Sequence, residues 1–229
     1  MRLTPRLLCT ASKIKKGSRP VDVGTDHAYL PIYLVENGIC SRIIASDLRY
    51  GPLKKAQKNI ELFNLKDKID LRQGFGLSPI RAGEADCAVI AGMGGLLICK
   101  ILSDGIDKAD DMSYFVIQPM QEVPEVRKYF YSSGYTIYDE ELVKERDKIY
   151  QVISAKQGLE IIDDKIYYEI GKKLIEKRDP LLNEFISGKI IKIEKIIKKI
   201  EKIKTLNVQD KIFYCRTKIS RYEEVLRCL

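Results

Sequence analysis

The sequence predicts a doubly wound α/β sheet followed by a pair of antiparallel helices. Three observations carry this prediction. Short apolar runs alternate with longer amphipathic runs over residues 20–132, two further strand-like runs follow at residues 135–155 with no helix between them, and isoleucines spaced by three and four begin at Ile186. We therefore expect an α/β domain over residues 1–155 and a helical domain over residues 156–229.

Strands and helices alternate along the first part of the chain. We expect strands at residues 20–23, 42–46, 69–72, 85–90 and 114–118, and helices at residues 28–37, 52–63, 94–102 and 124–132. Such alternation implies a parallel sheet with helices on both faces. Residues 135–143 and 148–155, joined by a charged turn at residues 144–147, are expected to form a closing antiparallel hairpin.

The last part of the chain has the pattern of an antiparallel coiled coil. Its apolar positions follow a heptad repeat at Ile186, Ile190, Ile193, Ile197 and Ile200, and again at Ile212, Cys215, Ile219, Tyr222, Leu226 and Leu229. A short link near residues 205–208 would fold the second helix back on the first, so that the two apolar stripes pack against each other.

Basic residues are concentrated in this helical part. Residues 1–155 carry 22 basic and 20 acidic side chains, a net charge of +2, whereas residues 156–229 carry 18 and 12, a net charge of +6. Lysines in excess on one helix either solvate that helix or contact a polyanion. The candidate RNA-binding residues are Lys192, Lys195, Lys199 and Lys202, together with Arg6, which could close over a site from the N-terminus.

Composition disfavours several functional classes. No hydrophobic run is long enough to span a bilayer, and no apolar stretch with a cleavage site follows the basic N-terminus, so we expect a cytoplasmic protein without membrane contact. The six cysteines form no C-x-x-C pair and His27 is the single histidine, which predicts reduced thiols and no metal site. No feature of the sequence indicates an obligate protein partner.

A turn with one glycine follows the first expected strand. The segment is Asp22, Val23, Gly24, Thr25, Asp26 and His27. A nicotinamide dinucleotide needs G-x-G-x-x-G here for its pyrophosphate, whereas S-adenosyl-L-methionine (SAM) has only a carboxylate and an ammonium group, for which one glycine suffices. Backbone amides at such a turn can hold an anion. The alternative for Asp22 is a hydrogen bond that only completes the strand end.

Three more strand ends supply candidate residues at the same edge of the sheet. Asp47 ends the second strand, where a carboxylate can accept both hydroxyls of a ribose; a helix N-cap or a turn is the alternative. Ala91, Gly92 and Met93 begin a second glycine-rich turn, which either admits a ligand close to the backbone or serves tight packing alone. Gln118 ends the fifth strand, and ligands of doubly wound sheets bind at these carboxyl ends.

The loop sequences resemble those of one bacterial family. The two motifs are Asp26-His27-Ala28-Tyr29-Leu30-Pro31 and Ala91-Gly92-Met93-Gly94-Gly95. Together they are similar to the tRNA (adenine-22-N1)-methyltransferases known as TrmK, over residues 1–155 and more loosely in the C-terminal hairpin. The resemblance implies a Rossmann-like methyltransferase sheet, SAM as cofactor, tRNA as partner and N1-methyladenosine as product. The antiparallel last strand is also typical of SAM-dependent methyltransferases.

The resemblance also implies a set of site residues. SAM would lie across Gly24, Asp26, Asp47 and Gly92. The full candidate set for cofactor binding is Asp22, Gly24, Thr25, Asp26, His27, Asp47, Gly74, Phe75, Ala91, Gly92 and Met93. Two positions depart from the family pattern, because Phe75 stands where an Asp is usual and Met120 where an Asn is often found. These departures remove side chains that would hydrogen-bond the SAM adenine and the target base.

Methylation of adenine N1 makes modest demands on the protein. N1 already carries a lone pair, so the site has to align the reactants and exclude water, without a strong base. The candidate catalytic residues are Asp26, Tyr29 and Gln118. Asp26 would hold the adenine amino group or balance the cationic product, and Tyr29 would stack on a flipped base or else pack within its helix. For His27, a structural role competes with a role as a base.

Three rival functions remain open on the sequence alone. A methyltransferase of the same fold could act on another RNA or on a protein. A nicotinamide oxidoreductase is disfavoured by the single glycine of the first loop. A catalytically silent homologue, which binds RNA without methyl transfer, is compatible with Phe75 and Met120.

Overall fold

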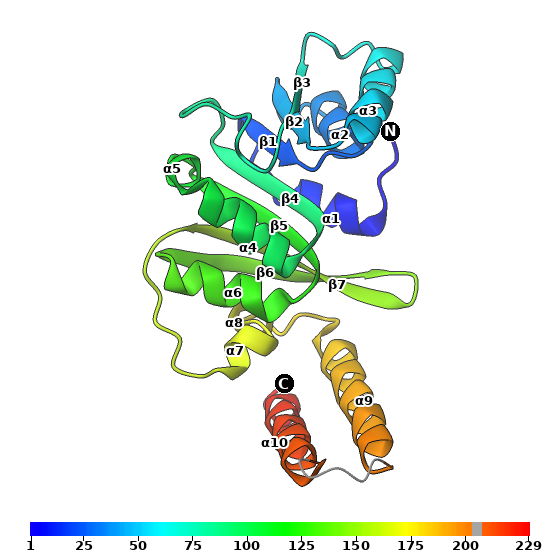
Figure 1. Cartoon of the computed structure of the whole chain (residues 1–229), viewed down its shortest axis with the longest axis vertical. Coiled ribbons are helices and arrows are strands. Elements are labelled where there is room, and N and C mark those ends of the chain that lie inside the picture. Colours follow the sequence, from blue (N-terminus) through cyan, green and yellow to red (C-terminus); the bar gives the residue numbers. More distant parts are fainter. Residues whose placement is uncertain (203–207) are drawn as a thin grey trace.

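A seven-stranded sheet forms the centre of the molecule (Figure 1). The computed structural model describes residues 1–202 and 208–229. The strands are β1 (Pro20–Val23), β2 (Ile43–Asp47), β3 (Ile69–Gln73), β4 (Cys87–Gly94), β5 (Tyr114–Gln121), β6 (Tyr135–Glu145) and β7 (Lys148–Gln157). They lie in the order β3-β2-β1-β4-β5-β7-β6, with β7 antiparallel to both its neighbours and the other neighbouring pairs parallel. The doubly wound sheet and its closing antiparallel hairpin are therefore confirmed.

Helices cover both faces of this sheet. One face carries α1 (Pro5–Ser12), α2 (Tyr29–Glu36) and α3 (Tyr50–Leu62), and the other carries α4 (Gly95–Asp104), α5 (Ile106–Ala109) and α6 (Val123–Ser132). The helices expected at residues 28–37, 52–63, 94–102 and 124–132 are thus present. Helices α1 and α5 were not predicted; in α1, Thr4 is the N-cap and Pro5 occupies the first turn.

Alternate residues of the central strands point to opposite faces of the sheet. In β5, Tyr114 and Val116 belong to the apolar cluster beneath α1 and α2, whereas Phe115 and Ile117 belong to the cluster beneath α4 and α6. All four side chains are buried, as expected of a strand covered on both faces. Gln118 is the next residue in this alternation, and its side chain points toward α1 and hydrogen-bonds a residue of that helix.

β4 extends further than the sequence predicted. It continues through Gly94, and its pairing with β5 is irregular between Ala91 and Gly94. At Gly95, α4 begins so close to the end of β5 that a Cβ would lie 2.9 Å from the carbonyl oxygen of Gln121. The second glycine-rich turn is therefore an irregular strand end, and its glycines permit close packing as well as access to the backbone.

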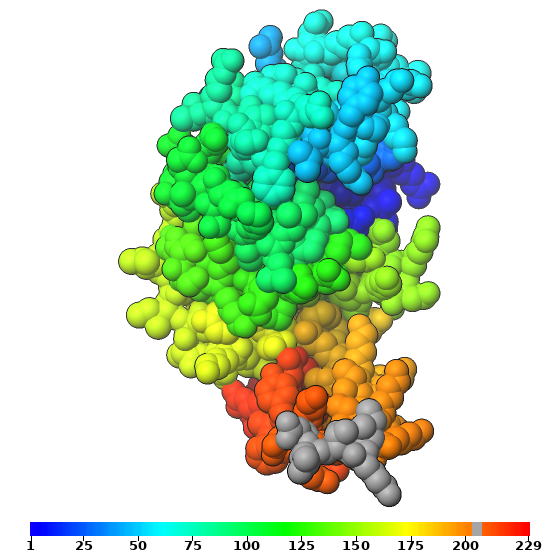
Figure 2. Space-filling view, viewed as in Figure 1, coloured from blue at the N-terminus to red at the C-terminus, as the bar shows by residue number. Residues whose placement is uncertain are grey.

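The C-terminal part forms the expected helical hairpin, a lobe narrower than the body at one end of the molecule (Figure 2). Its helices are α9 (Leu182–Ile200) and α10 (Val208–Arg227), and Ile186, Ile197, Ile212 and Tyr222 are buried among their apolar positions. Of the link expected near residues 205–208, all but Val208 lies outside the described residues. Two short helices that were not predicted, α7 (Ile166–Glu169) and α8 (Lys172–Glu176), connect β7 to the hairpin.

A buried guanidinium joins the sheet to this C-terminal part. Arg127 of α6 is fully buried and donates hydrogen bonds to Glu140 at 2.7 Å, to Gln151 at 2.7 Å and to the carbonyl oxygens of Tyr168 at 2.9 Å and Ile170 at 3.3 Å. Burial raises the pKa of Glu140, and the neighbouring Arg127 opposes that rise. We call these five residues the Arg127 network. This network fixes residues 168–170 against β6 and β7. The domain boundary at residue 155 stays a prediction.

Candidate functional site

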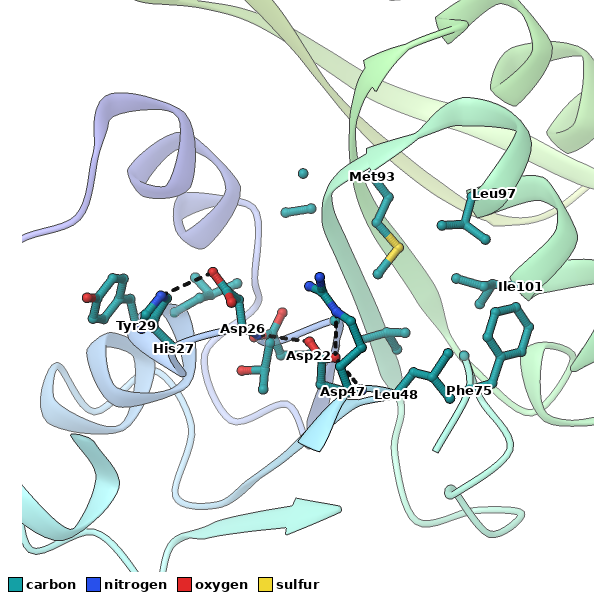
Figure 3. Close-up of a pocket in the computed structure, with 18 of the residues that line it drawn as sticks. Asp22, Asp26, His27, Tyr29, Asp47, Leu48, Phe75, Met93, Leu97 and Ile101 are labelled. Carbon is teal, nitrogen blue, oxygen red and sulfur yellow. Dashed lines mark hydrogen bonds and ion pairs between the residues drawn. The ribbon is translucent and has the colours of Figure 1, made fainter. Parts of the chain in front are cut away.

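A cavity of about 470 Å³ opens at the carboxyl ends of β1, β2 and β4 (Figure 3). Every residue of the predicted cofactor set lines it, and so does Tyr29. The remaining lining residues are Arg6, Leu7, Val23, Leu30, Leu48, Arg49, Gly76, Leu97 and Ile101. Loops far apart in the sequence therefore meet where the alternating pattern placed a ligand site.

The loop after β1 has an unusual backbone. Gly24 has φ +78°, Asp26 has φ +50° and Ala28 has φ +58°, so two residues with side chains adopt the left-handed region. The amides of Gly24 and Thr25 both donate to the carbonyl oxygen of Ser46, at 2.8 and 2.9 Å. These two amides are thus used within the protein, which is contrary to the expectation that this turn would offer free amides to an anion. Strain of this kind is found at ligand-binding loops.

Asp47 is a buried carboxylate at the floor of the cavity. It is only 6% exposed, its Oδ1 accepts from the Arg49 amide at 2.9 Å and its Oδ2 accepts from the Asp26 amide at 3.3 Å. A turn was the predicted alternative to a ribose contact for Asp47. This turn is present, because the hydrogen bond from the Arg49 amide closes it. Each oxygen keeps a second lone pair for a ligand hydroxyl.

Asp22 is a second buried carboxylate of the lining. Burial raises its pKa to about 7, and the Asp47 carboxylate adds to that rise. The Thr25 hydroxyl opposes it, although this hydroxyl forms no hydrogen bond of normal geometry within the described chain. A carboxylate that has lost its water without gaining a cation is poised to take a positively charged ligand group. Asp22 therefore suits an ammonium group.

Asp26, His27 and Tyr29 lie together on another side of the cavity (Figure 3). His27 Nε2 is 3.5 Å from Asp26 Oδ2, and the rings of His27 and Tyr29 stack with centroids 5.2 Å apart. Tyr29 is 41% exposed, so its packing against His27 leaves part of the ring free for a planar ligand. The structure thus places an exposed carboxylate beside an aromatic face.

The opposite wall of the cavity is apolar. Leu48, Phe75, Leu97 and Ile101 line it together, and Met93 lies between this wall and the loop after β1 (Figure 3). The Met93 methyl group occupies the place that a Cβ of Gly24 would take, and the φ of +78° at Gly24 itself favours glycine. An apolar wall next to a carboxylate that can bind ribose suits a nucleoside base.

Gln118 and Arg6 form a pair on the α1 side of the cavity. Gln118 does not line the cavity; its side chain is fully buried, and its Oε1 accepts from Arg6 Nη1 at 2.6 Å and from the Gly92 amide at 3.1 Å. Arg6 does line the cavity, and its guanidinium also lies 5.4 Å from the centre of the Tyr150 ring. Gln118 thus touches the site through Arg6, and its predicted catalytic role stays a prediction.

A family model now decides the class of protein. The model for tRNA (adenine(22)-N(1))-methyltransferases, TrmK, matches residues 20–224. The chain belongs to this family. The match spans the sheet, the cavity apart from Arg6 and Leu7, and most of the hairpin, in accord with the resemblance of the two loop motifs.

Individual members of the TrmK family agree in sequence and structure. The tRNA (adenine(22)-N(1))-methyltransferase of Bacillus subtilis is 39% identical over 158 residues, 69% of this chain and 66% of that protein. The crystal structure of Streptococcus pneumoniae Sp1610 with S-adenosyl-L-methionine has a TM-score of 0.89 at 29% identity, covering 98% of this chain and 100% of that one. M. capricolum TrmK with S-adenosyl-homocysteine has a TM-score of 0.85 at 26% identity, covering 100% and 99%.

The predicted RNA-binding lysines of this TrmK-family chain lie on the hairpin. Lys192, Lys195 and Lys199 of α9 are exposed, as is Lys202 just beyond it, and within the described ranges none of the four forms an ion pair. Lys189, one turn earlier, is different. Its ammonium lies 3.7 Å from Glu169 and beside the Tyr222 ring, and burial lowers its pKa to about 8. Lys189 is therefore part of the packing between the hairpin and α7.

Metal and disulfide chemistry find no support among the described residues. No three His, Cys, Asp or Glu side chains among them come together as metal ligands. All six cysteines are free, and Cys9, Cys40 and Cys87 are buried. A search of the described helices finds none that combines the length and the apolar character needed to cross a membrane.

Several residues of this TrmK-family site were not predicted from the sequence. Leu48 and Arg49 follow the acidic end of β2 directly, which is a signal that could have found them. Leu97 and Ile101 lie one helical turn apart in α4, behind the second glycine motif, and helical spacing could have indicated them. Tyr150 carried no signal, because it reaches the site only through Arg6 of the unpredicted helix α1.

Proposed function

We propose that this chain transfers a methyl group from SAM to N1 of adenine 22 in tRNA. The observation that carries the proposal is the cavity at the carboxyl edge of the sheet, with the buried Asp47 carboxylate beside the Gly24 loop. The family model that covers residues 20–224 supports the reaction. Because tRNA is the proposed substrate, the cytosol is the proposed place of action.

The residues of the cavity fit SAM. Asp47 would accept the two ribose hydroxyls, and the apolar wall that includes Leu48 and Phe75 would hold the adenine. Asp22, whose pKa burial raises to about 7, would gain a counterion in the SAM ammonium. Phe75 offers ring contact in place of the hydrogen bond that an Asp would give. The cofactor complexes of two relatives support this assignment.

The chemical demands on the chain are small. When bound, SAM would supply a methyl group whose bond to the cationic sulfur breaks, with S-adenosylhomocysteine as the leaving group, as the lone pair of adenine N1 forms the new bond. The protein therefore does not have to remove a proton first. The chain's own residues have to align the two reactants and keep water out. Tyr29, exposed beside the cavity, is proposed to stack on the extruded base, since a base within a duplex or a stack has to be flipped out to react.

Asp26 is proposed to balance the positive charge that the methylated adenine acquires. Its carboxylate lines the cavity beside His27 and Tyr29. We expect Asp26→Ala to lower the single-turnover methylation rate by about tenfold or more, with little change in the affinity for either substrate. Asp67→Ala, which removes an exposed carboxylate at the other edge of the sheet, is the matched control. A collapse of SAM binding with an unchanged rate at saturation would make Asp26 a cofactor ligand instead.

The hairpin is proposed to bind the tRNA backbone. Lys192, Lys195, Lys199 and Lys202 are exposed on one lobe of the molecule, and the C-terminal part carries a net charge of +6. Lysines without carboxylate partners are free to contact phosphates. In this proposal residues 1–155 hold the reactants and residues 156–229 add affinity for tRNA.

Mass mapping of methylated nucleosides tests the proposed reaction. Transcribed tRNA is incubated with the protein and SAM, digested and mapped, with a transcript that carries guanine at position 22 as the control. N1-methyladenosine at position 22 of the first transcript alone is the expected result. Methylation of another position or of protein would overturn the substrate, and tRNA binding without any methyl transfer would indicate the silent homologue.

A further inference from the structure

The last two strands extend past the rest of the sheet as a two-stranded ribbon. β7 pairs with β5 only at residues 153–155, whereas β6 and β7 stay paired with each other as far as Glu145 and Lys148. Residues 142–151 therefore pair only with one another, and we call them the β6–β7 ribbon. The ribbon projects from the body of the molecule between α1 and α9 (Figure 1).

One face of the ribbon lies against α1 at the cavity. Side chains that pair across the ribbon, or that lie two residues apart along a strand, share a face, so Glu145, Lys148 and Tyr150 point the same way. Glu145 Oε2 accepts from the Arg6 backbone amide at 3.0 Å, and the Tyr150 ring lies 5.4 Å from Arg6 Cζ. Because Arg6 lines the cavity, this face reaches the edge of the proposed reaction site.

The other face of the ribbon packs on the helical hairpin. Ile149 packs against the apolar cluster of the hairpin, and Lys144 Nζ donates to Glu184 Oε1 at 2.6 Å, in the first turn of α9. The candidate RNA-binding lysines follow Glu184 at 8, 11, 15 and 18 residues, and these spacings keep a helix on one side: Lys192, Lys195, Lys199 and Lys202. The row of lysines therefore lies on the side of α9 that the ribbon touches.

Two basic side chains at the end of the ribbon are open to a ligand. Arg146 and Lys148 are exposed, and within residues 1–202 and 208–229 neither forms an ion pair. The exposed Asp147 separates them in the chain, which keeps the net charge of the ribbon end low. Such an end suits a few placed phosphate contacts more than a long-range attraction of a polyanion.

We propose that Arg146 and Lys148 of the β6–β7 ribbon contact the tRNA phosphates next to the target nucleotide. This inference rests on the proposed function, since it presumes that tRNA lies over the cavity. Phosphate contacts fix the register of a nucleic acid on a protein without reading its sequence. The ribbon lies between the cavity and the lysine row, so it would determine which nucleotide reaches the cavity, while the lysines add affinity further away.

The salt dependence of tRNA binding tests these contacts. Arg146→Asn combined with Lys148→Gln should weaken binding of transcribed tRNA about 2- to 30-fold at low salt, with SAM affinity unchanged. The slope of log affinity against log salt should fall by about 1.4 to 1.8 for two lost contacts. Asn is chosen because Arg146 has φ +55°, which Asn adopts more readily than most residues.

Two further variants control for total charge and for folding. Lys16→Gln combined with Lys68→Gln removes two exposed lysines at the amino ends of β1 and β3, far from the cavity edge of the sheet, and should bind tRNA nearly as the parent does. Arg146→Lys combined with Lys148→Arg keeps both charges and should also match the parent. If this second variant loses as much affinity as the Asn and Gln variant, the ribbon has only a structural role and the inference is overturned.

A short RNA tests where on the tRNA the ribbon binds. A stem–loop cut from the transcript around adenine 22 keeps the phosphates next to the target and removes most of the remaining tRNA. The ribbon variant should lose the same factor in affinity on the stem–loop as on the whole tRNA. If it binds the stem–loop as the parent does, its contacts lie elsewhere on the tRNA and the inference is overturned.

The outcomes separate this inference from the proposed function. If the parent binds SAM but neither RNA, the proposed function fails and the inference fails with it. If the parent methylates adenine 22 and the ribbon variant keeps the parent's affinity and salt slope, the inference alone is overturned. Equal losses in the Lys16 and Lys68 control would mean that total charge alone matters, which would likewise overturn it.

Discussion

The cavity and the helical hairpin are two regions built on opposite principles. The cavity brings together buried carboxylates and loops in strained backbone conformations, and Asp22 and Asp47 are both less than 7% exposed. The hairpin has a regular heptad stripe of isoleucines inside and lysines that are exposed outside. The cavity thus has buried carboxylates, whereas the hairpin has lysines that are exposed to solvent.

This difference follows from what each region binds. A small cofactor with a defined shape is held by a few groups, each of which has to be placed and desolvated. A polyanion is held by many contacts that need only charge and exposure. The cavity is therefore sensitive to single substitutions, and the hairpin tolerates them one at a time.

The largest expected effect lies in the Arg127 network, between the cavity and the hairpin, which fixes residues 168–170 against the sheet. Arg127→Met would leave Glu140 buried without its partner, and losing one member of such a pair costs about 3 to 5 kcal/mol. Urea denaturation would measure the free energy of unfolding. Combining Arg127→Met with Glu140→Met should cost less than the single change, because no buried charge is left alone. A loss below about 1 kcal/mol for Arg127→Met would show that apolar contacts, and not the Arg127 network, fix residues 168–170 against the sheet.

The next effect concerns the hairpin alone. Replacing Lys192, Lys195, Lys199 and Lys202 by Gln should weaken tRNA binding and leave SAM affinity unchanged. If each lysine meets a phosphate, the slope of log affinity against log salt should fall by about 3 in total, from 0.7 to 0.9 per contact. The matched control replaces four exposed lysines of the body, Lys16, Lys54, Lys58 and Lys68. Equal losses in both variants would mean that total charge matters and that the hairpin has no special role.

A single substitution in the cavity should weaken SAM binding and leave tRNA binding unchanged, the opposite of the hairpin variant. Asp47→Ala removes both proposed ribose contacts, each worth roughly 1.5 to 3 kcal/mol before compensation, so SAM affinity should fall about tenfold or more. Binding of tRNA, measured without SAM, should stay near that of the parent. Calorimetric titration with unchanged SAM affinity would remove Asp47 from the site.

The smallest effect is the pH dependence of the ligand-free protein. Because burial raises the pKa of Asp22 to about 7, the folded state holds its proton more tightly than the unfolded state does. Stability from this group is present at pH 4 and is lost as the pH rises toward 7. Asp22→Asn should therefore gain in melting temperature relative to the parent between pH 5 and pH 8. An identical pH profile for both proteins would show that Asp22 has no raised pKa.

Most of the cavity could be predicted from the sequence because its residues follow strand ends directly. Asp22, Asp47 and Gly92 were found in this way, since parallel strands bring their carboxyl ends to one edge. The pair of Arg6 and Gln118 could not be found as a pair. Its geometry depends on α1 packing against β5, and an eight-residue helix whose cap and Pro5 were not recognised gave no reason to place Arg6 there.

The hairpin shows the opposite limit of sequence reasoning. Its heptad pattern predicted the pairing of the two helices, and the structure has it. The pattern could not show that Lys189 turns inward to Glu169, because that contact depends on α7, which no periodicity indicated. The number of lysines predicts that the helix is basic. Which of these lysines are exposed depends on the elements that pack against the helix.

The Arg127 network has a consequence for how the molecule comes apart. Two of the four hydrogen bonds from this buried guanidinium go to the carbonyl oxygens of Tyr168 and Ile170, so releasing the C-terminal part would leave buried donors without acceptors. Partly open states in which the chain from residue 168 onward detaches from the sheet are thereby made costly. We expect the backbone amides of β6 and of α9 to exchange with solvent deuterium with the same free energy of opening. Both would exchange only through global unfolding, as one cooperative unit.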